Sequence, residues 1–157
     1  MTIKLLAIGK TDAKQLNDLI DVYKKRLRHY ISFTIDVIPD LKNTKNLSEN
    51  EQKQKEGELI LKKLSNTDAL ILLDENGKQL DSVGFSKYLQ KHMNAGVKQL
   101  VFVIGGPYGF SQEVYQKANG KLSLSKMTFS HQMIRLFFTE QLYRAFTILK
   151  NEPYHHK

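Results

Sequence analysis

A glycine-rich segment directly after an apolar run is the part of this sequence best suited to binding a ligand. Residues 100–104 (LVFVI) are apolar, and residues 105–109 (GGPYG) follow at once. A buried strand that ends in glycines leaves backbone N–H and C=O groups accessible at the edge of a sheet, where small ligands commonly bind. Taken alone, however, this glycine segment indicates no more than a tight turn.

The glycine segment does not match the common nucleotide-binding loops. It lacks the Lys-Ser or Lys-Thr ending of a P-loop and the three-glycine spacing of a dinucleotide fingerprint. It also follows the fourth expected strand, whereas the common Rossmann-type methyltransferases carry their glycine turn after the first. We therefore expect no ordinary Rossmann cofactor site.

A second stretch, residues 122–130 (LSLSKMTFS), contains several small hydroxyl side chains and is followed by His131. An imidazole can accept or donate a proton near neutral pH. Because His131 stands just before an expected helix, it can equally be a capping or packing histidine. Without other information, the apolar Met127 and Phe129 are expected to be core residues.

Apolar runs alternate with amphipathic segments along the chain. We expect strands over residues 3–8, 31–38, 69–73, 100–104 and 122–124, and helices over residues 16–27, 48–64, 82–94, 111–117 and 132–150. This alternation predicts a single α/β domain over residues 1–157, with a mostly parallel sheet flanked by helices. Ligands bind at the carboxyl ends of such strands, where Gly9, an Asn76-Gly77 turn and the glycine segment are expected.

The composition limits the class of protein. The net charge of +8 indicates a polyanionic partner, with nucleic acid first and a small anionic substrate as the alternative. The lack of cysteine excludes disulfides and thiolate metal sites, and no other metal-binding cluster is visible. No apolar run approaches the roughly 20 residues of a membrane-spanning helix, so we expect a cytoplasmic location.

Cationic residues are concentrated near the end of the first expected helix: Lys24, Lys25, Arg26 and Arg28. The negative end of the helix dipole favours cations at this place, which gives the cluster a structural interpretation. Its density is also sufficient for a patch that binds RNA phosphates.

The last expected helix, residues 132–150, is apolar around most of its circumference. A helix of this kind is buried on more than one side. In a chain of this length, we expect one of those sides to contact a second subunit.

Four motifs together resemble one family closely. They are residues 103–109 (VIGGPYG), 122–131 (LSLSKMTFSH), 142–145 (LYRA) and 153–155 (PYH). In this order they resemble the ribosomal large-subunit pseudouridine methyltransferase H (RlmH) family of the SPOUT class, and the similarity extends along the whole chain. The resemblance implies a SPOUT-type α/β fold with a C-terminal trefoil knot, a homodimer, and S-adenosylmethionine as the cofactor.

The resemblance also implies where the cofactor binds. The family uses the end of the third strand, the glycine segment and the Ser-rich loop, which are here Leu73, Gly105, Gly106, Ser125, Lys126, Met127, Thr128, Phe129 and Ser130. Many family members have proline where this chain has Ser130, so this position departs from the family pattern. Glycine allows a ligand to approach the backbone closely, which agrees with the assignment.

The reaction that the resemblance implies is methylation of N3 of a pseudouridine in 23S ribosomal RNA of the assembled ribosome. The N3 proton must leave, so a base or a stabilising cation is expected, and the candidates are His131, Arg144, Tyr154 and His155. Arg144 follows Glu140 at the spacing of an ion pair, which is an alternative role. By composition the tail would be a frayed terminus, whereas the resemblance implies that it helps to build the active site beside the partner subunit.

Two other functions stay open from the sequence. One is a non-catalytic ribosome- or RNA-binding protein of the same fold, against which the glycine segment, the Ser-rich loop and the Tyr-His tail argue. The other is a flavodoxin-like nucleotide or phosphate enzyme, for which residues 9–12 (GKTD) would have to form the anion-binding turn. Binding of S-adenosylmethionine would separate the methyltransferase from the non-catalytic protein.

Overall fold

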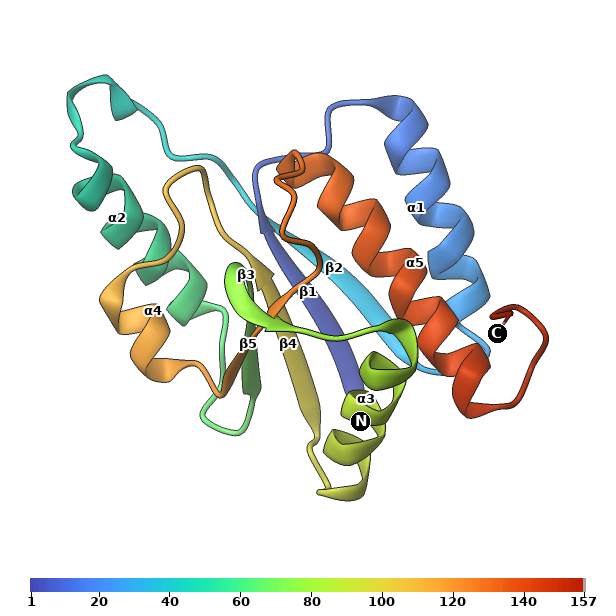
Figure 1. Cartoon of the computed structure of the whole chain (residues 1–157). Helices are drawn as coiled ribbons and strands as arrows, with labels where there is room; N and C mark the ends of the chain where they lie inside the picture. The colour runs from blue at the N-terminus through green and yellow to red at the C-terminus, as the bar shows by residue number, and fades with distance from the viewer. Residues whose placement is uncertain (157) are drawn as a thin grey trace.

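The computed structural model describes residues 1–156, and its centre is a five-stranded parallel sheet (Figure 1). The strands are β1 (Thr2–Ile8), β2 (Ser32–Ile38), β3 (Ala69–Gln79), β4 (Gln99–Ile104) and β5 (Gly120–Ser123). The helices are α1 (Lys14–Leu27), α2 (Glu49–Lys62), α3 (Ser82–Asn94), α4 (Gln112–Lys117) and α5 (His131–Leu149), with a short 3-10 helix η1 (Thr44–Asn46). The strand order is β2-β1-β4-β3-β5, so the predicted α/β class is confirmed.

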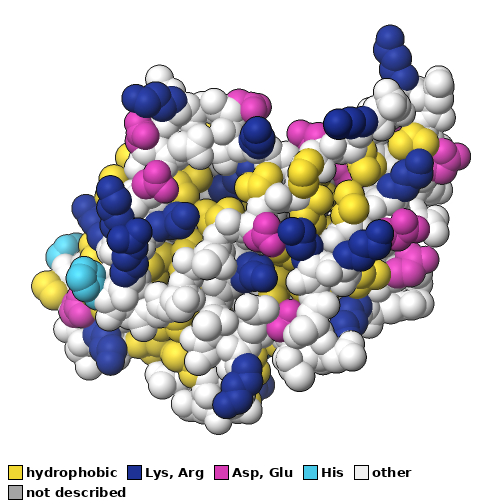
Figure 2. Space-filling view, turned by 180° about the vertical axis from the view of Figure 1, so that it is seen from behind, with side chains coloured by type: hydrophobic (Ala, Val, Ile, Leu, Met, Phe, Trp, Pro, Cys, Tyr) yellow, Lys and Arg dark blue, Asp and Glu magenta, His cyan; other side chains and the backbone are white. Residues whose placement is uncertain are grey.

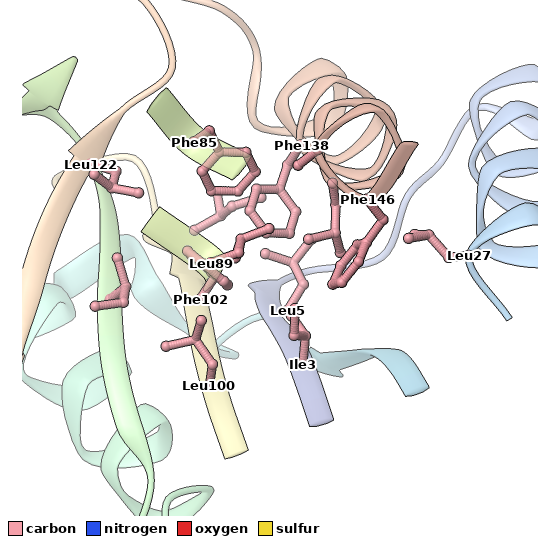
Figure 3. Packing of buried hydrophobic residues seen from close by; sticks show 14 residues of the cluster. Ile3, Leu5, Leu27, Phe85, Leu89, Leu100, Phe102, Leu122, Phe138 and Phe146 are labelled. Atoms are coloured by element: carbon pink, nitrogen blue, oxygen red, sulfur yellow. The ribbon is translucent and has the colours of Figure 1, made fainter. Parts of the chain in front are cut away.

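Helices cover both faces of the sheet, with α1, α3 and α5 on one face and α2 and α4 on the other. Alternate residues of β4 point to opposite faces, as the strand period requires. Phe102 packs against Phe138 of α5 and Phe85 of α3, with ring centroids 4.8 and 6.2 Å away (Figure 3). Val101 and Val103 belong to the opposite core, together with residues of α2 and α4.

Side-chain caps define where several helices begin. Ser48 accepts a hydrogen bond from the N–H of Glu51 at 3.1 Å, and Asp81 accepts one from Gly84 at 2.6 Å. These bonds satisfy backbone donors that have no partner within the helix. The helices expected after residues 48 and 81 therefore begin where the sequence predicts.

The expected turn at Asn76-Gly77 does not end the strand, because β3 runs to Gln79, but residues 74–77 leave the pairing with β5 at this place. The pairing of β3 with β5 shifts register between Leu73 and Lys78, which marks a bulge. At the bulge the Asp74 carboxylate accepts the N–H of Asn76 at 2.9 Å. A Cβ on Gly77 would lie 2.6–2.8 Å from the backbone of Leu122, so glycine here permits close strand packing and not a reversal of the chain.

α5 lies beside α1 and buries one side against the sheet (Figure 1). Leu142 and Ala145 are fully buried, whereas Phe137 is exposed to solvent on the other side. No helix within residues 1–156, α5 included, is long and apolar enough to cross a membrane.

Candidate active site

A cavity of about 430 Å³ opens at the carboxyl ends of β3, β4 and β5. Most of the predicted cofactor residues line it: Leu73, Gly105, Gly106, Ser125, Met127, Thr128 and Phe129. The glycine segment closes on itself, since the Gly109 N–H donates to the Gly106 carbonyl at 3.2 Å. Gly109 has a φ of +82°, which glycine adopts without strain. The glycine segment and the Ser-rich loop, which residues 110–121 separate in the sequence, thus line one cavity.

Two of the predicted cofactor residues lie outside the wall of this cavity. Lys126 is exposed to solvent. Ser130 is the N-cap of α5, and its hydroxyl accepts the N–H of Met133 at 3.2 Å. In the position where many family members carry proline, this chain therefore has a side chain that begins the helix.

Internal hydrogen bonds hold the Ser-rich loop. The Ser123 hydroxyl donates to the Ser125 carbonyl at 2.9 Å, and the Ser125 hydroxyl accepts the Met127 N–H at 2.9 Å. Met127 is 75% exposed and Phe129 is 36% exposed, so the expectation that these are core residues is wrong. Their apolar surfaces are available to a ligand or to another chain.

Acidic side chains also line the cavity, at positions that no motif in the sequence indicates. Asp74 and Glu75 line the cavity. The Tyr115 hydroxyl donates to the Asp74 carboxylate at 2.5 Å, and burial together with this bond raises the pKa of Tyr115 to about 12. Carboxylates suit a cationic ligand. Among the described residues, they belong to no group of three or more side chains that could hold a metal ion.

His131 also lines this cavity, at the first turn of α5. Burial lowers the pKa of His131, and the neighbouring Arg135 cation lowers it further. The imidazole is therefore neutral at pH 7 and able to accept a proton. His131 is not the cap of α5, because Ser130 is the N-cap residue.

Arg135 is buried but is not part of the cavity wall. It donates to the Ile8 carbonyl and to the Thr11 hydroxyl, both at 2.9 Å. Burial lowers its pKa, whereas the carboxylates of Asp40 and Asp12 oppose this effect. Arg135 thus fixes α5 to the end of β1.

A second cavity, of about 820 Å³, adjoins the first and lies along α5. The two share wall residues of the Ser-rich loop and α5: Ser123, Leu124, Ser125, Phe129 and Ile134. Glu140 and Arg144 line the second cavity together with Leu19 and Tyr23 of α1. A group bound in one cavity is therefore next to a group bound in the other.

The C-terminal tail packs against α5 through Glu140. Arg144 donates to this carboxylate at 2.5 and 3.0 Å, and the Tyr154 hydroxyl donates to the same oxygen at 3.0 Å. The bond to Glu140 raises the pKa of Arg144, while burial and the bonds to Tyr23 and Glu140 raise that of Tyr154. The Arg144 guanidinium lies 4.7 Å from the centroid of the Tyr154 ring and 3.3 Å from Nδ1 of His155.

The predicted catalytic residues therefore fall into two places within one chain. His131 lines the first cavity, and Arg144 lines the second. Tyr154 and His155 are beside Arg144 but line neither of these two cavities.

The basic cluster lies at the end of α1. Lys25, Arg26 and Arg28 are exposed, and Lys24 is half-buried. The Arg26 guanidinium lies 5.4 Å from the ring centroid of Tyr23 and 5.6 Å from that of Tyr143, so part of the cluster packs on aromatic rings. Figure 2 shows Lys and Arg side chains gathered along the edge of the molecule where α1 and the C-terminus lie in Figure 1.

Comparison with known proteins identifies the family of this chain. A family model described as "Predicted SPOUT methyltransferase" matches residues 1–155. Proteins named "Ribosomal RNA large subunit methyltransferase H" are 73% identical in Flavobacterium johnsoniae, 70% in Christiangramia forsetii and 64% in Parabacteroides distasonis, over 157 residues and 100% of each chain. The chain therefore belongs to the SPOUT methyltransferase family, in its ribosomal RNA large subunit methyltransferase H group.

Proposed function

We propose that this protein transfers a methyl group from S-adenosylmethionine to N3 of a pseudouridine in 23S ribosomal RNA of the assembled ribosome. The names of its relatives support ribosomal RNA as the substrate. The observation that carries the proposal is the single cavity built by the glycine segment and the Ser-rich loop, the two stretches through which the family binds its cofactor.

The cavity fits S-adenosylmethionine in size and chemistry. Its volume of about 430 Å³ lies within the range of small-molecule sites. Leu73, Met127 and Phe129 supply apolar walls, and Gly105 and Gly106 supply backbone groups. Asp74 and Glu75 complement the positive charge of the ligand. When bound, the sulfonium supplies an activated methyl group for an in-line displacement, in which alignment provides much of the rate.

Residues of α5 and the tail are suited to the acceptor base. His131 is neutral at pH 7 and can take up the N3 proton, either directly or through water. Arg144 stays cationic and can stabilise the anion that loss of this proton creates. Tyr154 and His155 position Arg144 from its other side.

We infer that the protein acts as a homodimer of single-domain chains, in the cytoplasm. Leu19 and Val22 of α1 and Phe129 and Phe137 near and on α5 are exposed apolar side chains. Apolar side chains gathered on adjacent elements favour a protein interface. A second subunit on this surface would bring its tail to the cofactor cavity, whose wall within one chain includes no tail residue up to His156.

The decisive experiment uses ribosomes from a strain that lacks the protein. Purified protein and methyl-labelled S-adenosylmethionine are added, and the labelled nucleotide is mapped. We expect one labelled pseudouridine in 23S RNA of assembled ribosomes and none in free RNA. Ribosome binding without methyl transfer would instead identify a non-catalytic protein of this fold, and label at another position would refute the assigned target.

A further inference from the structure

Glu56 of α2 lies directly behind the glycine segment. It is 3% exposed, although glutamate is rarely buried unless it is paired. A Cβ added to Gly106 would come 2.6 Å from Oε2 of Glu56 and closer still to Oε1. The carboxyl group therefore occupies the space that any side chain at position 106 would need.

The residue after Glu56 makes a similar contact with the end of the same turn. A Cβ on Gly57 would collide with the Ser111 hydroxyl and would lie 3.2 Å from Val114. Ser111 in turn caps α4 through the Val114 N–H. Two consecutive residues of α2 thus hold the turn between β4 and α4 from behind, one at each end.

The position of this carboxyl group carries an energetic cost. Among the described residues, Oε1 of Glu56 has no hydrogen-bond partner. Burial raises the pKa of Glu56, and Asp40 raises it further, while a hydrogen bond from Gln52 opposes the change. A buried acid without full pairing destabilises the fold, so a packing role alone would be served better by an apolar side chain of similar size.

We propose that Glu56 is a positioning residue for the methyl donor: its carboxyl group fixes the backbone at Gly106 so that the cavity wall has the shape that S-adenosylmethionine requires. This inference rests on the proposed function, because it assigns the cavity to that cofactor. Glu56 does not touch the cofactor and acts only through the turn.

Calorimetry with S-adenosylmethionine tests the inference on the full-length protein. We expect Glu56→Ala to raise the Kd by about tenfold or more, and Glu56→Gln, which keeps the shape, to stay close to the wild type. At saturating cofactor, kcat of Glu56→Ala should be nearly unchanged, since the acceptor groups are untouched. Glu58→Ala, an exposed neighbour on α2, is the matched control.

A double-mutant cycle tests the contact itself. Gly106→Ala should weaken cofactor binding strongly in the wild type but much less in the Glu56→Ala background, because the colliding carboxyl is gone. The same coupling is expected in the free energy of unfolding without cofactor. Additive effects in both measurements, or equal Kd values for Glu56→Ala and the wild type, would overturn the inference. Failure of the wild-type protein to bind S-adenosylmethionine would instead remove the proposed function.

Discussion

Glu140 has a role that its position in the sequence only partly suggests. Its spacing from Arg144 predicts an ion pair, which the structure contains. The same carboxylate also accepts bonds from Tyr154 and from the amide of Gln141. Through Gln141 the network extends to the Ser82 hydroxyl at the start of α3. Glu140 therefore connects the tail, the predicted catalytic arginine and the second cavity.

Replacing Glu140 by Gln should separate stability from activity. The change weakens the ion pair to Arg144 and one acceptor for Tyr154, so we expect the free energy of unfolding to fall by about 1 kcal/mol. Methylation should fall much further, by about 100-fold, because Arg144 and the tail lose their alignment. Urea unfolding and methyl transfer to ribosomes measure the two effects. An activity loss no larger than that of Glu58→Gln would contradict this role.

The pH dependence of the reaction tests His131. Burial and the Arg135 cation lower its pKa, so the imidazole stays neutral to a lower pH than an ordinary histidine. If it accepts the N3 proton, single-turnover rates should fall as the pH drops through this lowered pKa. His131→Asn should remove this fall in rate at low pH and reduce the rate by about 100-fold. The control His92→Asn on α3 should leave the pH–rate profile unchanged. If the His131→Asn enzyme still loses rate at low pH in the same way, His131 is excluded as the base.

At the level of single residues, the sequence identifies groups that belong to motifs and misses groups that act through packing. His131, Gly106 and Arg144 stand in recognisable motifs, and the structure places each at a cavity or in contact with its wall. Glu56 lies in a strongly charged segment whose pattern indicates a solvated helix, yet it is buried against Gly106. Only the crossing of α2 behind β4 brings them together, and this is a long-range contact.

Among the elements, the tail differs most from what its composition predicts. A polar terminus is normally frayed, but here Tyr154 packs on Tyr143 with ring centroids 4.7 Å apart. The Tyr30 hydroxyl donates to the Glu152 carboxylate at 2.5 Å, a bond that raises the pKa of Tyr30 to about 12. These contacts hold the tail against α5 and against the segment that joins α1 to β2.

Removal of residues 154–157 should abolish methylation and leave the fold intact. The core lies in the sheet and its helices, so we expect a cooperative unfolding transition close to that of the full chain. S-adenosylmethionine should still bind, because no tail residue up to His156 lines the first cavity. Calorimetry and methyl transfer to ribosomes are the two measurements. Full activity of the shortened protein would show that the tail has no part in the reaction.

The cluster on α1 is expected to contact RNA through its exposed members. Reversing the charge of Lys25 and Arg28 should lower ribosome affinity about tenfold or more and reduce its salt dependence. Arg26 is left unchanged, since it packs on Tyr23 and Tyr143. Filter binding at several salt concentrations measures both quantities, and Lys55→Glu on α2 is the control. If ribosome affinity depends on salt concentration equally in the charge-reversal variant and in the Lys55→Glu control, the RNA surface lies elsewhere.

The sequence predicts elements well where local signals agree. It fails where pairing with a distant strand decides the course of the chain. Hydrophobic runs and capping residues locate the five strands and the long helices. Asn76-Gly77 has the local signal of a turn, but it lies in a bulge within β3, because β3 resumes its pairing with β5 at Lys78. The trefoil knot stays a prediction from the family, because no local pattern encodes the order in which a chain is threaded.

At the scale of the whole molecule, the first cavity and the C-terminal tail lie apart within one chain, since no tail residue up to His156 lines that cavity. The cofactor cavity faces the carboxyl ends of the strands, and the tail lies against the far part of α5 and α1. The exposed apolar side chains of Leu19, Phe129 and Phe137 line the second cavity, together with Glu140 and Arg144. A symmetric dimer through this surface would pair each cavity with the other chain's tail.

Mixed dimers test whether the two halves come from different chains. One variant carries Gly106→Val, whose side chain would collide with Glu56 and displace the glycine segment, and the other lacks residues 154–157. Each is expected to be inactive as a homodimer. A dimer of one chain of each kind, isolated through two affinity tags, should regain about half of the wild-type activity, because one of its two sites is then intact. If the site were formed within one chain, every site in the mixed dimer would carry a defect, and the isolated dimer would be as inactive as its parents.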